Sequence, residues 1–106
     1  MKSGYVYIWE YIVKAEHADD FLRAYAPDGE WVKLFLGRPG YKKTELLRDS
    51  GNPLRFVTID YWEDASSWQA FRREKSKEFE SLDQKCENFT LSEKQIGLFE
   101  PIEKAM

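Results

Sequence analysis

Two carboxylates interrupt stretches that are otherwise rich in aromatic and β-branched residues. Glu10 lies within Tyr5–Val13, and Asp60 lies within residues 54–62. Two carboxyl groups close together in a low-dielectric pocket raise the pKa of one of them and form an acid–base pair. If the two stretches are antiparallel neighbours, we expect the two carboxylates to lie close together. The alternative interpretation is that each one faces an arginine, a lysine or solvent.

Aromatic residues form the second candidate set, because they make up 16% of the chain. If several line one cavity, it would suit a flat hydrophobic ligand held by stacking. Packing of the core and of a dimer would explain each of them equally well. Tyr7, Tyr11, Glu10 or Asp60 could take a proton from such a ligand. The candidates for ligand contact are Trp9, Tyr11, Trp31, Trp62, Trp68 and Phe71.

The only histidine and the only cysteine favour structural roles. His17 begins a predicted helix, where a surface or capping role is the simpler interpretation. Cys86 follows a helical pattern, so we expect a small packing residue, and a single cysteine forms no intrachain disulfide. We predict no metal site, because no other ligand cluster stands at suitable spacing from the histidine.

Length and charge limit the number of domains and the kinds of partner that we expect for this protein. The 106 residues are expected to form one domain, 1–106, with an ordered core over about 5–99 and a poorly ordered tail over 100–106. The net charge is −3 and no basic stripe is present, so we expect no nucleic-acid partner. No apolar run is long enough to span a membrane, which predicts a soluble, cytoplasmic protein.

Alternating strand and helix patterns must position these residues. Strand patterns cover Tyr5–Val13, residues 41–48, residues 54–62 and Thr90–Phe99. Helical patterns cover residues 17–25, a short piece over 28–36, and a longer stretch after the predicted cap Asp64, with a kink near Ser76. This order predicts an α+β, ferredoxin-like β-α-β-β-α-β fold, a four-stranded antiparallel sheet with helices on one face.

Two local features refine that fold. Residues 49–53 (Asp-Ser-Gly-Asn-Pro) predict a hairpin turn, because Gly and Asn tolerate positive φ and Pro fixes the exit. The first and third strands are apolar on both faces, which indicates that the second face of the sheet is also covered. A two-fold homodimer that buries sheet against sheet would cover it.

Three stretches resemble the antibiotic biosynthesis monooxygenase (ABM) domain family. They are Arg-Pro-Gly-Tyr at 38–41, Thr-Glu-Leu-Leu-Arg-Asp at 44–49, and Phe-Val-Thr-Ile-Asp-Tyr-Trp-Glu-Asp at 56–64. The resemblance covers about residues 5–99. It implies a dimeric α+β barrel with a cavity between sheet and helices in each subunit. Members of the family include cofactor-independent oxygenases of aromatic polyketides and quinol-type substrates, and haem-degrading enzymes.

The residues that the haem-degrading branch uses are not present at the matching positions. That branch uses an Asn on the first strand and a Trp and a His on the long helix. The matching positions fall near Trp9, Phe71 and Ser81. The resemblance therefore implies no haem cleavage, and we predict no cofactor. Many family members also carry a histidine at the position of Phe71.

Two functional hypotheses follow from these residues. The first is a cofactor-independent monooxygenase, an oxidoreductase acting on a small hydrophobic aromatic compound. The alternative is a non-catalytic dimeric module of the same fold, with a ligand-binding or structural role. In both, the expected partners are a second copy of the chain and a small hydrophobic molecule.

Overall fold

The computed structural model describes residues 4–102. The strands are β1 (Tyr5–Val13), β2 (Tyr41–Asp49), β3 (Asn52–Trp62) and β4 (Thr90–Phe99). The helices are α1 (Ala18–Tyr25), α2 (Glu30–Phe35), α3 (Ala65–Glu74) and α4 (Ser76–Cys86), with short 3-10 turns η1 (Ala15–His17) and η2 (Glu87–Phe89). The predicted β-α-β-β-α-β order is confirmed, with each helical region divided in two. Of the tail predicted to be poorly ordered, residues 103–106 lie outside the described residues.

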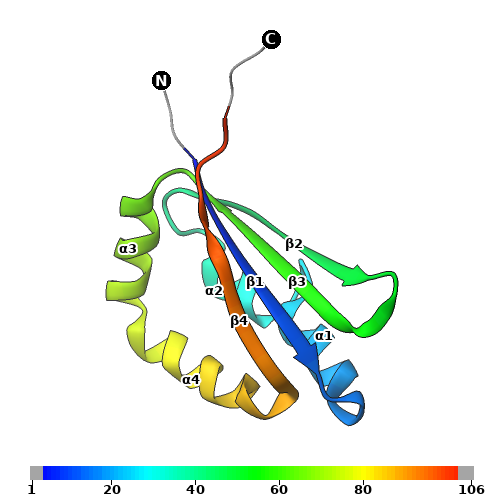
Figure 1. Ribbon diagram of the computed structural model, residues 1–106. Coiled ribbons are helices and arrows are strands. Elements are labelled where there is room, and N and C mark those ends of the chain that lie inside the picture. Colours follow the sequence, from blue (N-terminus) through cyan, green and yellow to red (C-terminus); the bar gives the residue numbers. More distant parts are fainter. Residues whose placement is uncertain (1–3, 103–106) are drawn as a thin grey trace.

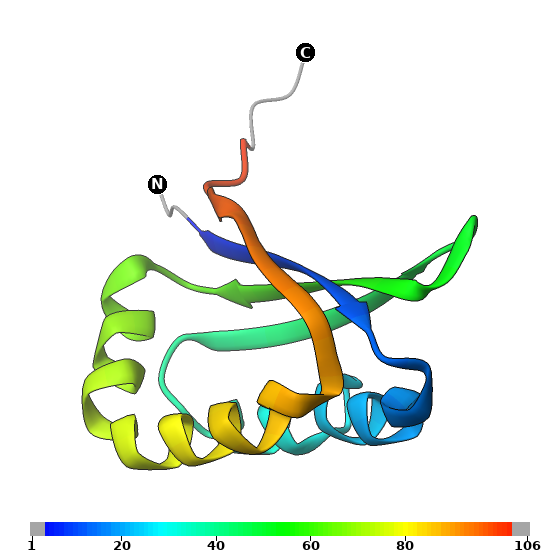
Figure 2. The same cartoon turned by 60° about the horizontal axis from the view of Figure 1, so that its bottom comes forward.

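The four strands form one antiparallel sheet in the order β2-β3-β1-β4. The first and third strands are central, and the charged second strand lies at an edge (Figure 1). All four α-helices lie on the same side of the sheet, and no helix of residues 4–102 covers its other face (Figure 2). This is the ferredoxin-like α+β architecture.

The long helical region begins and bends where its sequence indicated. The Asp64 carboxylate accepts a hydrogen bond from the backbone N–H of Ser67 at 2.8 Å, which caps the start of α3. Lys75 then leaves helical geometry, with φ −118° and ψ 28°, and separates α3 from α4. Figure 1 shows the resulting bend, close to the predicted kink at Ser76. The bend lets both helices follow the curved sheet.

The β2–β3 hairpin is tighter than the sequence predicted. Asp49 pairs directly with Asn52, so only Ser50 and Gly51 lie between the strands. The expected positive φ in this turn is wrong, because positive φ among the described residues occurs only at two other glycines. Side chains hold the turn instead: Asp49 accepts from the Gly51 N–H at 2.7 Å, and Asn52 accepts from the Leu54 N–H at 3.0 Å.

Gly40, just before β2, lies in close contact with the residues at the start of α3. Gly40 has φ +86°, and its carbonyl oxygen accepts a hydrogen bond from the Glu63 N–H at 2.7 Å. A Cβ atom at this position would overlap the Ser67 side chain. The Pro-Gly pair before β2 therefore supplies both a left-handed backbone conformation and room for the helix.

The core lies between the sheet and the helices. Its largest fully buried side chains are Trp62, Phe21, Phe71, Val13 and Cys86. Burial raises the pKa of the Cys86 thiol to about 11, which keeps it neutral and fits the predicted packing role. Within residues 4–102, no helix combines the length and the apolar character needed to cross a bilayer.

Candidate functional site

A cavity lies between the sheet and the helical layer, and its wall is mainly aromatic. A water molecule's centre can move through about 70 Å³ of it, whereas an apolar cavity of roughly 150 Å³ holds benzene. A ring therefore enters fully only when the lining side chains move outward. The lining residues are Tyr7, Trp9, Tyr11, Tyr25, Trp31, Phe35, Thr44, Thr58, Asp60, Trp68, Phe79, Asp83 and Glu93.

The structure brings most of the predicted site residues to this cavity. Tyr7, Trp9 and Tyr11 reach it from β1 because alternate residues of a strand face the same side. Asp60 reaches it from β3, and Trp31 and Trp68 complete the predicted group from α2 and α3.

Two predicted ligand-contact residues lie behind the cavity wall. Trp62 and Phe71 are almost fully buried in the core and do not line the cavity. Their rings pack on Trp68, with centroids 5.6 Å away in both cases. They hold a lining side chain in place, which is how they influence the site.

The predicted pairing of Glu10 with Asp60 is wrong. Directly opposed residues of antiparallel strands share a face, and Asp60 lies opposite Tyr7 whereas Glu10 lies opposite Val57. The two carboxylates therefore point to opposite faces of the sheet. Glu10 accepts a hydrogen bond from Arg55 Nε at 2.6 Å, which is the alternative that the sequence left open.

Asp60 is a carboxyl group held between the core and the cavity. Thr44 Oγ1 donates a hydrogen bond to Asp60 Oδ1 at 2.6 Å. Some of its surface stays accessible on the cavity side, while densely packed protein surrounds the rest. This burial raises the pKa of Asp60 to about 6, although the Thr44 hydrogen bond opposes the shift. At neutral pH Asp60 is mainly a carboxylate that accepts a proton readily.

Tyr7 lies opposite Asp60, and its phenol is protonated at neutral pH. Burial raises the pKa of the Tyr7 phenol above its ordinary value of 10.0. A protonated phenol donates a hydrogen bond and does not act as a base at neutral pH, so the structure gives no support to Tyr7 as the proton acceptor. The Tyr7 ring packs edge-on against Trp68, with centroids 4.8 Å apart. This contact fixes the ring at the cavity wall.

The charged groups of the cavity wall are all acidic. Asp83 from α4 and Glu93 from β4 join Asp60, and burial raises the pKa of both carboxyls. No lysine or arginine is among the lining residues of the described chain. The wall therefore disfavours an anionic ligand and suits a neutral or cationic one.

Several lining residues were not singled out from the sequence. Tyr25 lies in α1 and Phe79 in α4, where an aromatic residue on an amphipathic helix by itself indicates core packing. Thr58 shares a strand face with Phe56 and Asp60, so the alternation along β3 could have placed it at the cavity. Thr44 gave no comparable signal, because a bulge determines which face it occupies. Outside the site, His17 is half-buried at the N-cap of α1, where it makes no side-chain cap, and its Nδ1 lies 3.0 Å from the Asp20 carboxylate.

A family model matches most of the sequence. The sequence model described as antibiotic biosynthesis monooxygenase, ABM, matches residues 5–81. This stretch includes β1, the hairpin and α3. No curated protein matches the sequence.

Solved structures share the fold at low sequence identity. A protein from Nitrosomonas europaea assigned to the antibiotic biosynthesis monooxygenases superposes with a TM-score of 0.76 at 15% identity, covering 97% of this chain and 94% of that one. The cofactor-independent oxygenase SnoaB from Streptomyces nogalater gives a TM-score of 0.71 at 18% identity, covering 97% and 96%. A Bordetella bronchiseptica protein with the same assignment as the first gives 0.71 at 17% identity, covering 99% and 100%.

Proposed function

Because the chain belongs to the antibiotic biosynthesis monooxygenase family, we propose that it is a cofactor-independent monooxygenase acting on a small hydrophobic aromatic compound. The observation that carries this proposal is the Asp60 carboxylate, which lines an aromatic cavity and whose pKa burial raises to about 6. The likeness to SnoaB, described as a cofactor-independent oxygenase, is consistent with it.

Asp60 is the proposed general base. It would accept a proton from an activated CH₂ group next to a phenol or enol, because its carboxylate form dominates at neutral pH. Tyr7, directly across the β1–β3 ladder, would donate a hydrogen bond to the oxygen of the resulting enolate. The aromatic walls keep water from the anion and hold its ring by stacking.

Oxygen then reacts with the substrate anion itself. The anion transfers an electron to O₂, and a C–O bond forms between the two radicals. The resulting peroxide anion takes back the proton from Asp60. Asp60 then removes the second C–H proton while the peroxide loses hydroxide, which leaves a carbonyl group. The proton on Asp60 and the hydroxide combine to form water. The sum is CH₂ + O₂ → C=O + H₂O, in which the substrate supplies all four electrons.

The cavity limits the substrate class. About 70 Å³ of internal space and an aromatic wall favour a compact, flat molecule over an extended one. The three acidic side chains of the wall disfavour substrates that carry a carboxylate or sulfonate. We therefore propose a neutral or cationic phenol, quinol or anthrone-type substrate, whose rings enter as the lining side chains move outward.

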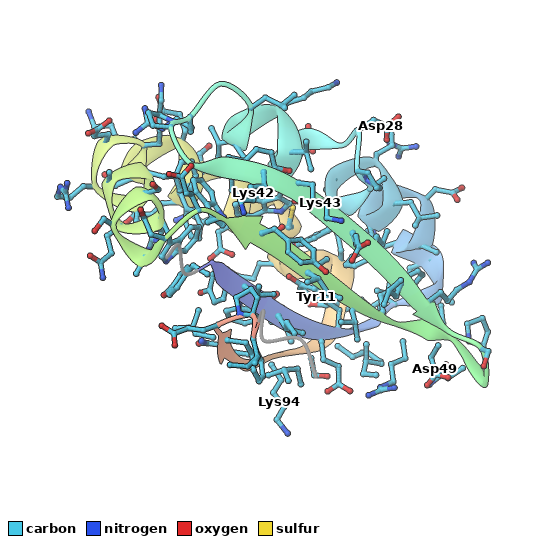
Figure 3. All side chains as sticks on the ribbon, turned by 90° about the horizontal axis from the view of Figure 1, so that it is seen from above. Tyr11, Asp28, Lys42, Lys43, Asp49 and Lys94 are labelled. Carbon is cyan, nitrogen blue, oxygen red and sulfur yellow. The ribbon has the colours of Figure 1, made fainter. Side chains whose placement is uncertain are left out.

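We further propose that two copies pair through the open face of the sheet. Apolar side chains occupy its centre, and Ile8 and Ile59 are directly opposed across β1 and β3. Charged groups frame this centre, including the Glu10–Arg55 ion pair. Figure 3 shows Lys42 and Lys43 on edge strand β2 and Lys94 on the opposite edge strand β4. Charged edges oppose edge-to-edge pairing and leave face-to-face pairing as the way to cover the apolar centre.

Oxygen uptake by the purified protein tests the proposed activity. Quinols and anthrones of increasing ring number are supplied with a chelator present, and uptake is compared with the spontaneous reaction. We expect consumption of one O₂ per substrate molecule for the compounds that fit the cavity. If aromatic compounds bind but none of them causes oxygen uptake, the protein is a ligand-binding module and the oxygenase proposal is rejected.

A further inference from the structure

A hydrogen-bond chain of two hydroxyl groups ends at the cavity carboxylate. Tyr41 Oη lies 2.8 Å from Thr44 Oγ1, and Thr44 Oγ1 donates to Asp60 Oδ1 at 2.6 Å. A threonine hydroxyl has a single proton. Since that proton lies on the bond to Asp60, Tyr41 is the donor to Thr44. Both hydroxyl protons therefore point toward the carboxylate.

An irregularity in β2 makes this hydrogen-bond chain possible. Residues three apart in a regular strand point to opposite faces, so Tyr41 and Thr44 would not meet. Here Tyr41 pairs with Trp62 and Lys43 pairs with Tyr61, which leaves Lys42 as an extra residue in β2. Such a bulge re-aims the side chains around it. It brings Tyr41 and Thr44 to the face that carries Asp60.

We propose that Thr44 and Tyr41 are positioning residues for Asp60, with the Thr44 hydroxyl fixing Oδ1 so that Oδ2 is left to accept the substrate proton, and with Tyr41 orienting that hydroxyl. This inference rests on the proposed role of Asp60 as general base. Thr44 lines the cavity and Tyr41 does not, so the Tyr41 hydroxyl reaches Asp60 through the Thr44 hydroxyl. A hydrogen bond to a carboxylate stabilises its charged form, which is the form that a base requires.

The other ionisable groups around the cavity cannot replace this contribution. Tyr7 and Tyr11 of β1 and Tyr25 of α1 are neutral, because burial raises the pKa of each phenol. Asp83 of α4 and Glu93 of β4 are acids, and their charge has the same sign as that of Asp60. Burial also raises the pKa of Tyr41, so it keeps the proton that it donates. Thr44 is thus the group that favours the Asp60 carboxylate.

A titration that needs no turnover tests the inference. Protein labelled with ¹³C at the aspartate side-chain carboxyl is titrated by NMR, and Asp60→Asn identifies the Asp60 resonance. We expect Thr44→Val to raise the Asp60 midpoint by roughly one pH unit. Thr44→Ser, which restores the hydroxyl, should return the midpoint close to that of the wild type. Tyr41→Phe should raise the midpoint by a smaller amount.

A double variant separates positioning from a general structural effect. If Tyr41 acts through Thr44, then adding Tyr41→Phe to Thr44→Val should leave the Asp60 midpoint where Thr44→Val alone puts it. An unchanged midpoint in Thr44→Val, or an undiminished effect of Tyr41→Phe in the double variant, would overturn the inference. Failure of the proposed oxygenase activity would appear separately, as absence of oxygen uptake with these midpoints shifted as expected.

Discussion

Tyr7 lies directly opposite Asp60 in the ladder between β1 and β3, and both side chains face the aromatic cavity. Burial raises the pKa of both groups, so at neutral pH one is a protonated donor and the other a ready proton acceptor. A hydroxylated ring between them would meet a hydrogen-bond donor and a base.

The rate should depend on pH through Asp60. Because the base must be deprotonated, kcat/KM should be constant above the pKa of about 6 and should fall about tenfold for each pH unit below it. Initial rates across this range measure the profile. Thr44→Val should move the acid limb upward, in parallel with the NMR midpoint. A profile without an acid limb in this range would place the base elsewhere.

The same carboxyl should weaken the fold as pH rises. Asp60 has an ordinary pKa of 3.8 and a folded value of about 6, so the folded state binds its proton more tightly. Its contribution is favourable below 3.8 and is lost as pH rises through about 6, on the order of 3 kcal/mol. Asp60→Asn should lack this loss and be more stable than the wild type at pH 7.

Denaturant unfolding at fixed protein concentration, repeated across that pH window, measures the difference. Asp83 and Glu93 also have raised pKa values, so only the difference between wild type and Asp60→Asn isolates Asp60. Asparagine can still accept from Thr44, which preserves the local hydrogen bond. A difference that does not change with pH would mean that Asp60 titrates alike in the folded and unfolded chain.

Two glycines with similar backbone angles should respond differently to alanine. Gly37 and Gly40 have φ +82° and +86°, so either substitution places a Cβ in a left-handed conformation at about 1 kcal/mol. Nothing lies within 4 Å of a Cβ at Gly37, whereas one at Gly40 overlaps Ser67. We expect Gly40→Ala to lose at least about 1 kcal/mol more than Gly37→Ala in the free energy of unfolding. Equal losses would show that the β2–α3 junction adapts freely.

A charge at the centre of the open sheet face should separate the proposed dimer. Ile59 faces Ile8 there, and a lysine in its place would put like charges together in an apolar interface. Light scattering after size exclusion should report a dimer for the wild type and a monomer for Ile59→Lys. Leu36→Lys, at an exposed position that ends α2, is the matched control and should stay dimeric. A monomeric wild type at micromolar concentration would contradict the pairing.

Much of the fold could be predicted because local signals agree with it. The Asp64 cap, the Pro-Gly before β2 and the β-branched strands each indicate one local structure, and together they allow few topologies. The hairpin length was missed because Asp49 and Asn52 hold the turn through their side chains. Burial of Cys86 followed from its helical stripe. The cytoplasmic location stays a prediction.

The site was harder to predict because it depends on strand register. The side chains of each strand alternate between the two faces of the sheet. Because both faces of β1 and of β3 are apolar, the sequence does not indicate which face of one strand matches which face of the other. The actual register places Asp60 beside Tyr7 and sends Glu10 to the other side. A one-residue shift would have reversed this outcome. The bulge at Lys42 likewise decides the position of Thr44 without a local sequence signal.

The most direct measurement is oxygen uptake by the wild type and by Asp60→Asn on the same substrate, the fastest quinol or anthrone found, with a chelator present at pH 7. We expect the wild type to consume one O₂ per substrate and the variant, though folded and at least as stable, to be slower by about 10²- to 10⁴-fold. Uptake by the variant at the wild-type rate, or uptake by neither protein above the spontaneous rate, would rule out Asp60 as the base of an oxygenase.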